Sequence, residues 1–484
     1  MMTAHPQITH ALVDDTDEFL SPIAAHALAQ RNRALTATPI KQQARALFIE
    51  RLKPEHAHIS TQELDAASDE TRAKVEKIAW GVGKALQERG YAAKGVMLSD
   101  DAVEQLVAYL MAVQFGAGEL ESLFQEEDVE DIVINTVPMS RTQAQVEVWT
   151  FRQSGKRREQ VDLTPEDVIE LVNRSARMQG RALTPMTPIL NAQMAHGGRA
   201  GRVNAVLDPV CDPALSVTIR IHRLVARSFD DLVRLGTLTD AAASWLWLCV
   251  RARLAMVIGG GTSSGKTNFL NALCALLPPD ERVVCIEDTR ELDLAVADKV
   301  YLTTVITADG TRAVNQRQLV ANALRMRPDR LLLGEVRDAA AFDAIKATNT
   351  GHDGTLLTVH AEDAEGVVKR LMQLASEAPE TVNMPERTLQ DYVASAFQCV
   401  VFLKRVRQPD GSIKRFVTEI AELNGFVQNG RINQQSLFKW KDSALAWTHN
   451  WPDGRIKTRI LGAGFSETHI EAALTGRAQL WREV

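Results

Sequence analysis

Apolar residues recur three and four positions apart over much of the first 118 residues. The segments IKQQARALFIERL, TRAKVEKIAWGVGKALQERG and SDDAVEQLVAYLMAVQ show this spacing, which predicts a helical preface over residues 39–118. Ser99 is the expected N-cap of the third helix, because acids follow it in the first turn. Residues 1–38 show no sustained period, and we expect a flexible arm there.

The pattern becomes mixed between residues 119 and 228. The runs VEDIVIN, QVEVWTF, GRVNAVLDP and LSVTIRIH predict strands, whereas TPEDVIELVNRSARMQG predicts a capped helix. This mixture indicates a smaller α+β N-terminal domain.

Short apolar runs alternate with helical segments from residue 236 to residue 484. LAMVI, RVVCIED, RLLLGEV and GTLLTVHA predict buried strands, and KTNFLNALCALL, RQLVANALRM and AFDAIKATNT predict the helices between them. Such alternation predicts an α/β domain with a mostly parallel sheet that is covered on both faces. Residues 426–484 are expected to form its C-terminal cap. We interpret the tryptophans there as core anchors before any partner site: Trp440, Trp447, Trp451 and Trp481.

Composition excludes some classes of protein and some kinds of site, but it does not indicate a function. With 484 residues, 45% of them hydrophobic and 24% charged, the chain is typical of a globular protein of two or three domains. The net charge of -6 gives no reason to expect direct binding to nucleic acid. The five cysteines are scattered without a CxxC pair, which argues against a disulfide framework or a structural zinc site and favours a reducing cytoplasm.

Membrane contact is expected to be peripheral. The N-terminus carries acids where an export signal would carry a basic segment and an apolar core. The most apolar run, WLWLCVRARLAMVIGG, is interrupted by Arg251 and Arg253, short of the ~20 apolar residues that a spanning helix needs.

A glycine-rich loop between a predicted strand and a predicted helix satisfies the pattern GxxxxGK[ST]. Glycines let backbone N–H groups turn toward phosphate oxygens, and the following helix presents its positive end to the same anion. Lys266 would add a charge at the β- and γ-phosphates, and Thr267 a hydroxyl to Mg²⁺. The alternative is a glycine turn that only joins two elements. The nucleotide-binding candidates here are Gly260, Gly261, Thr262, Ser263, Ser264, Gly265, Lys266, Thr267 and Asn268.

Acids and histidines follow other predicted strands of the same sheet. Glu335 follows RLLLG, and Glu287 ends the run VVCIE. Because the carboxyl ends of parallel strands share one edge, both acids are candidates for metal and water positioning. His360 ends the next strand, with His352 in the preceding loop, so both are catalytic candidates near a γ-phosphate. A zinc pair ranks last, because the two histidines are eight positions apart with no thiol nearby.

Four segments resemble, in order, the Walker A, Asp box, Walker B and His box of the type II/IV secretion ATPases. They are GGGTSSGKTNF, IEDTRELDL, LRMRPDRLLLGEVRD and NTGHDGTLLTVHAE. GELESLFQEEDVEDIVIN and GRVNAVLDPVCDPALSVTIRIHR resemble the N-terminal signatures of that family, so the resemblance covers about residues 100 to 425. The branch most similar to this chain is the CpaF/TadA group of tight-adherence pili, with the conjugative and type IV secretion traffic ATPases as close relatives.

The resemblance implies a RecA-like P-loop domain, a PAS-like N-terminal domain and a homo-hexameric ring that binds ATP and Mg²⁺ between the two domains. Glu335 would be the Walker B acid, holding Mg²⁺ together with Thr267 and partly through water. Glu287 would be the general base, although which glutamate activates water stays open. His352 and His360 would sense the γ-phosphate.

Arginines complete the implied site. Arg220 and Arg202 would reach the nucleotide from the N-terminal domain, with an exposed surface charge as the alternative. Arg325, Arg327 and Arg337 are candidates for charge stabilisation or subunit contacts, without a ranking among them.

The implied function is a cytoplasmic motor, peripheral to the bacterial inner membrane, that docks on membrane platform proteins and powers pilus assembly, pilus retraction or secretion. Three departures from the family pattern bear on the branch. Thr136 follows Asn135 where glycine is usual, and AHGGRAGRVN replaces an acid-glycine turn. The CxxC pairs of many relatives are also missing, and this absence favours CpaF/TadA or the traffic ATPases. The rival functions are a RecA-like DNA-stimulated helicase or recombinase and a non-enzymatic, nucleotide-gated assembly subunit.

Overall fold

The computed structural model describes most of the chain beyond residue 38 and divides into two compact units. The first unit is Met1–Glu121 with Val161–Leu163, and the second is Ser122–Gln160 with Thr164–Val484. The flexible arm predicted for residues 1–38 lies outside the described residues. The structure describes residues 39–60, 63–64, 67–88, 98–138, 144–152, 154–177, 180–196, 199–212, 214–221, 228–306, 312–428 and 430–482.

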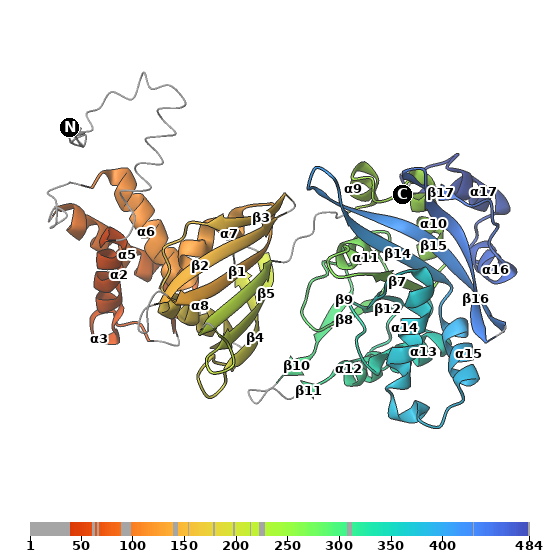
Figure 1. Ribbon diagram of the computed structural model, residues 1–484, viewed down its shortest axis with the longest axis horizontal. Coiled ribbons are helices and arrows are strands. Elements are labelled where there is room, and N and C mark those ends of the chain that lie inside the picture. Colours follow the sequence, from red (N-terminus) through yellow and green to blue (C-terminus); the bar gives the residue numbers. More distant parts are fainter. Residues whose placement is uncertain are drawn as a thin grey trace, which may run out of the picture. The chain divides into compact units, whose positions relative to one another are not determined.

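The described elements of the first unit are helices (Figure 1). The three helices that the apolar spacing predicted are confirmed, and they share a core that includes Phe48, Val75 and Leu110. Ser99 accepts a hydrogen bond from the Ala102 N–H, so the predicted N-cap is also confirmed. The elements are α2 (Pro39–Leu52), α3 (Pro54–Ala57), α5 (Asp69–Glu88), α6 (Asp100–Phe115) and the short helix η1 (Gly118–Leu120).

The described residues of the second unit form two large sheets and a two-stranded ribbon. The first large sheet has six antiparallel strands in the order β3-β2-β1-β6-β5-β4. The amphipathic helix α8 (Pro165–Arg177) packs against β2 and β4. The charged edge strand β3 was not predicted, because GKRRE has no apolar period and forms a strand only by pairing with β2. The other elements are α7 (Glu121–Gln125), β1 (Val129–Pro138), β2 (Ala144–Arg152), β3 (Gly155–Glu159), β4 (Ile189–His196), β5 (Arg199–Leu207) and β6 (Leu215–Ile221).

The second sheet has nine strands in the order β17-β16-β15-β14-β7-β13-β12-β8-β9. The strands from β14 to β9 pair in parallel, as predicted, whereas β15, β16 and β17 continue the sheet in antiparallel pairs. The sheet is therefore mostly parallel, as predicted, and strands that include part of the expected C-terminal cap extend it into a mixed sheet. The strands are β7 (Met256–Gly260), β8 (Val283–Glu287), β9 (Lys299–Thr303), β12 (Arg330–Leu333), β13 (Leu356–His360), β14 (Cys399–Arg407), β15 (Ile413–Gln428), β16 (Arg431–Lys441) and β17 (Ala444–Trp447). A separate ribbon pairs β10 (Val305–Ile306) with β11 (Arg312–Val314).

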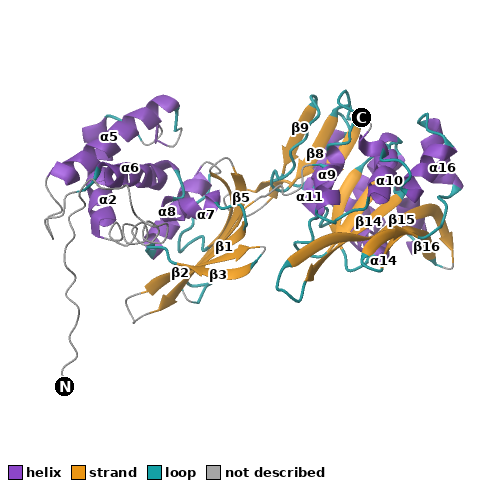
Figure 2. Cartoon of the chain, turned by 90° about the horizontal axis from the view of Figure 1, so that it is seen from above, coloured by secondary structure: helices purple, strands orange, loops and turns teal. Residues whose placement is uncertain are grey.

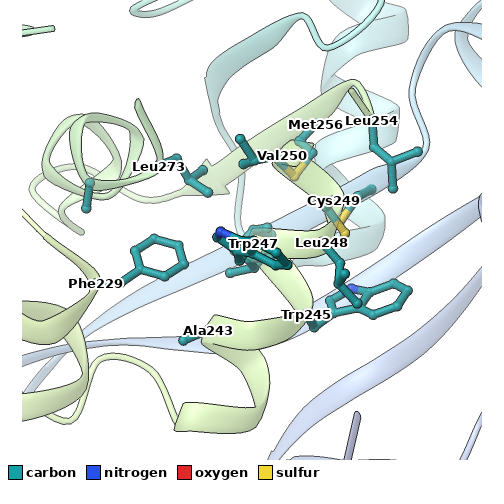
Figure 3. Packing of buried hydrophobic residues seen from close by; sticks show 14 of the residues in the cluster. Phe229, Ala243, Trp245, Trp247, Leu248, Cys249, Val250, Leu254, Met256 and Leu273 are labelled. Atoms are coloured by element: carbon teal, nitrogen blue, oxygen red, sulfur yellow. The ribbon is translucent and has the colours of Figure 1, made fainter. Parts of the chain in front are cut away.

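Helices cover both faces of this sheet (Figure 2). Along β7, Met256 and Ile258 point into one core and Val257 points into the other, because successive strand residues face opposite sides. Figure 3 shows side chains of the first core, among them Trp245, Trp247 and Met256. The helices are α9 (Phe229–Arg234), α10 (Asp240–Arg251), α11 (Lys266–Cys274), α12 (Gln316–Ala323), α13 (Ala340–Asn349), α14 (Ala364–Ser376), α15 (Glu386–Ala396), α16 (Gly454–Gly462), α17 (Glu467–Thr475) and the short η2 (Pro379–Thr381) and η3 (Leu480–Arg482).

The C-terminal tryptophans differ in burial. Trp481 is buried, and Trp440 and Trp447 pack against the same core from partly buried positions. Trp451 is 46% exposed, so its interpretation as a core anchor is wrong. Within the described part of the chain, none of the helices combines the length and apolarity needed to span a bilayer.

Candidate active site

The glycine-rich loop joins β7 to α11 at the carboxyl edge of the parallel strands. β7 ends at Gly260 and α11 begins at Lys266, with Gly265 as its N-cap in the left-handed region at φ 94°. A Cβ on Gly260 would lie 2.5 Å from Ser264 Oγ, so this close approach of loop to strand requires glycine. The loop therefore has the strand and helix that the motif requires.

Lys266 is the cation at the centre of the loop. Its Nζ donates to the carbonyl oxygens of Gly260 at 2.9 Å and Gly261 at 3.0 Å. Burial lowers its pKa to about 8, although the charge of Glu335 opposes the shift. Because that pKa still exceeds neutrality, the ammonium form predominates at pH 7.

A chain of polar contacts leads from Lys266 to the acid that follows β12. His360 Nδ1 lies 3.3 Å from Lys266 Nζ, and His360 Nε2 lies 2.9 Å from Glu335 Oε1. Arg337 donates to Glu335 Oε2 at 2.7 Å. Burial alone would raise the pKa of Glu335, but the hydrogen bonds and charges of His360 and Arg337 hold it well below its usual range. Glu335 is therefore ionised at neutral pH.

Glu287 ends β8, the next strand beyond β12, and is only 4% exposed. A Cβ on Gly334 would lie 2.8 Å from Glu287 Cγ, so the side chain lies directly beside the residue that precedes Glu335. Burial raises the pKa of Glu287 to about 7, while hydrogen bonds from the Glu291 and Leu292 N–H groups oppose the shift. Of the two acids, Glu287 is the one that can accept a proton near neutral pH.

His352 does not join this cluster, and the expectation that both histidines sense the γ-phosphate stays a prediction. It precedes β13, whereas His360 ends that strand, and a five-residue strand at ~3.3 Å per residue separates the two positions. The Nδ1 atom of His352 lies 3.2 Å from the Ala347 carbonyl oxygen at the end of α13.

The candidate arginines lie in different parts of the fold. Arg325 and Arg327 precede β12 and so lie toward its amino end, whereas Arg337 lies at the carboxyl edge. Arg202 and Arg220 are opposite each other on β5 and β6. Arg220 Nε donates to Asp131 at 2.8 Å, and Arg202 forms an ion pair with Glu291.

The loop retains a polar group that suits phosphate. Ser264 Oγ is buried and has no hydrogen-bond partner among the described residues, and its hydroxyl can donate to a phosphate oxygen. Asn268 Oδ1, in α11, is likewise buried without a partner there, but as an amide oxygen it can only accept a hydrogen bond. A Cβ added at Gly261 would meet nothing within 4 Å, so the loop is open on that side. The Ser264 hydroxyl and the charge of Lys266 fit a bound phosphate group, and Thr267 and Glu335 are the candidates to hold Mg²⁺ beside it.

One residue beside the loop was missed from the sequence. Arg415 of β15 donates from Nε to the Ser263 carbonyl oxygen at 2.9 Å. No motif marks it, and its contact depends on the position of β15 next to β14 and β7.

Comparison with known proteins defines the class. The family model for type II/IV secretion system proteins matches residues 193–455, and the chain belongs to this family. A protein of Mycobacterium tuberculosis provisionally named for conjugal transfer is 35% identical over 349 residues, which are 71% of this chain and 94% of that protein. PtlH, a type IV secretion system protein of Bordetella pertussis, is 32% identical over 330 residues, which are 63% of this chain and 94% of PtlH.

Solved structures give a further likeness. The VirB11 ATPase of the Brucella suis type IV secretion system, determined in complex with sulphate, is 25% identical in sequence. The match covers 66% of this chain and 96% of that protein, with a TM-score of 0.33.

Proposed function

We propose that this protein is a Mg²⁺-dependent ATPase that powers a secretion or pilus machine. The observation that carries the proposal is the contact chain from Lys266 through His360 to Glu335, which begins in the glycine-rich loop. A loop that binds phosphate, a cation inside it and an ionised acid on a neighbouring strand end are the parts that phosphoryl transfer needs. The family membership supports the same activity.

The residues divide the work by their surroundings. Lys266 and the loop N–H groups hold the phosphates, and Thr267 with Glu335 would hold Mg²⁺, which neutralises charge on the transferred phosphoryl group. Glu287 acts as the general base, because its raised pKa suits it to take a proton from the attacking water. The water oxygen bonds to the γ-phosphorus, and the bond to the leaving ADP oxygen breaks. His360 donates to the terminal phosphate from its position between Lys266 and Glu335.

The assembly is part of the proposal. We propose a RecA-like core with a PAS-like N-terminal domain, assembled as a homo-hexamer and placed in the cytoplasm against inner-membrane platform proteins. Arg202 and Arg220 would reach the nucleotide from the N-terminal domain. The relatives named for conjugal transfer and type IV secretion support a traffic ATPase as well as they support a CpaF/TadA-like pilus motor.

Phosphate release from Mg²⁺-ATP by the purified chain tests the activity. We expect turnover in the wild type, a loss of at least about 100-fold in Lys266→Ala and Glu335→Gln, and no change in Lys369→Ala. Lys369 is a matched control because its charge lies on the surface of α14, in an ion pair with Glu365. Turnover in the wild type no faster than in the site variants would favour the non-enzymatic subunit. Salt-sensitive stimulation by single-stranded DNA would favour the helicase.

A further inference from the structure

Arg415 lies beside the glycine-rich loop but belongs to the antiparallel part of the sheet. In the strand register, Leu403 of β14 is opposite both Gly260 of β7 and Val417 of β15. Arg415, two residues before Val417, therefore lies level with the loop that follows Gly260. Its backbone is fixed there, because Thr237 donates from Oγ1 to the Arg415 carbonyl at 3.0 Å and accepts from the Val417 N–H.

The guanidinium contacts the loop at its most constrained point. Ser263, whose carbonyl accepts from Arg415 Nε, has a φ of 57°, in the left-handed region that a non-glycine residue adopts at some cost. A Cβ on Gly265 would lie 3.4 Å from Arg415 Cδ, so the side chain also packs along the next left-handed residue. Arg415 thus supports both of these turns in the loop.

The hydrogen bond sets the direction of a whole peptide group. Because a trans peptide is planar, its C=O and N–H point in opposite directions. With the Ser263 carbonyl directed toward Arg415, the Ser264 N–H is directed toward the inside of the loop, where it bonds to the Gly261 carbonyl at 3.3 Å. Lys266 holds the Gly260 and Gly261 carbonyls from inside, and Arg415 holds the loop from outside.

We propose that Arg415 is a positioning residue that keeps the loop backbone in the form that receives the β-phosphate. The inference rests on the proposed function and adds a residue to it. When phosphate draws Lys266 away from the loop carbonyls, Arg415 remains as the cation that orders this backbone. The same guanidinium also contacts Glu130 from Nη2, at 2.9 and 3.0 Å, and any test must separate the two contacts.

Nucleotide affinity distinguishes a role of the Arg415 contact with Ser263 from a role of its contact with Glu130. We expect Arg415→Ala to weaken ADP and ATP by the same factor, about tenfold, because a hydrogen bond to a charged donor is lost and the loop holds the β-phosphate of both. Turnover at saturating ATP should change less than about threefold, so the loss is in KM rather than in kcat. Arg415→Lys should restore part of the affinity, since an ammonium can still donate to the Ser263 carbonyl.

Two controls make the test specific. Arg405 is opposite Arg415 on β14, is exposed and forms no ion pair with another described residue, so Arg405→Ala removes an equal charge without touching the loop. Glu130→Ala removes the second partner and leaves the Ser263 contact. Both variants should bind ADP within about twofold of the wild type.

The proposal fails if Arg415→Ala binds ADP normally, if it weakens ATP alone, or if either control shows the same loss. A fall in the thermal midpoint without nucleotide that accounts for the weaker binding would also overturn it, because that result indicates a general structural role. A wild type that binds neither nucleotide would instead refute the ATPase function itself.

Discussion

Two regions of the nine-stranded sheet each contain a buried glutamate: the carboxyl edge of the parallel strands and the antiparallel strands β15 to β17. In both cases burial raises the pKa of the glutamate to about 7. Glu287 lies beside Gly334 and next to the contact chain of Glu335, His360 and Lys266. Glu422 of β15 is opposite Cys399, which in turn is opposite Met256 at the amino end of β7. The same carboxyl chemistry therefore occurs toward both ends of the parallel strands, with Glu287 at their carboxyl edge and Glu422 level with their amino ends.

The hydrogen bonds around Glu422 give this residue a structural role, and no catalytic role is needed to explain its burial. Both of its carboxylate oxygens accept from the Asp453 N–H at 3.0 Å, just before α16, and Gln435 also donates to it. These contacts tie β15 and β16 to the C-terminal helices. A raised pKa in this protein thus reports burial, and the neighbours decide whether the group has a catalytic role.

Replacing each glutamate by glutamine gives the largest contrast. In Glu287→Gln we expect kcat for ATP hydrolysis to fall about 10²- to 10⁴-fold, because the proton acceptor is removed while the shape is kept. In Glu422→Gln we expect kcat within about threefold of the wild type. Steady-state phosphate release measures both, with ADP binding as the check that each variant is folded. Equal losses in the two variants would remove the distinction between the two glutamates.

Glu287 and Glu422 should both make the stability of the protein depend on pH in the same direction. A carboxyl with a folded pKa near 7 and an unfolded pKa near 4.5 keeps its proton longer in the folded state, so stability falls as the pH rises through this window. The expected loss is about 3 kcal/mol for each group as an upper figure, since both side chains are nearly inaccessible. Between pH 5.5 and pH 8.5, Glu287→Gln and Glu422→Gln should each lose less stability than the wild type.

Thermal midpoints at the two pH values measure this, with the double variant as a further check. Because the two glutamates lie at opposite ends of the parallel strands, their effects should add. A wild type whose midpoint does not fall with pH, or variants that fall as steeply as the wild type, would contradict the raised pKa values.

Local spacing was enough to predict the centre of the site. The glycine-rich pattern with Lys266 has one backbone arrangement, and parallel strands must deliver the acids after them to one edge. Glu335 and Glu287 therefore lie where their strands end. The buried strands were also predictable, because runs such as VVCI and RLLL are apolar on both faces.

Long-range pairing decided what the sequence did not show. β15 joins the sheet through a basic hairpin, and KRVR and IKR have no apolar period that would place them beside the loop. Arg415 is therefore invisible as a site residue until the strand order is known. In the same way, β3 becomes a strand only through its partner β2.

His360, at the end of β13, and His352, in the loop before it, provide the smallest and most local test of the comparison. His360 contacts Lys266 and Glu335, whereas His352 contacts the end of α13 at the other end of the strand. We expect His360→Ala to lower kcat about tenfold, by loss of one donor to the terminal phosphate, and His352→Ala to change it less than about twofold. His360→Gln should recover part of the activity, because an amide can still donate from a similar position. The opposite outcome is that His352→Ala lowers kcat as much as His360→Ala does, while ADP binding stays normal. Both ends of β13 would then have to reach a nucleotide in the working enzyme, which one strand within one subunit does not allow.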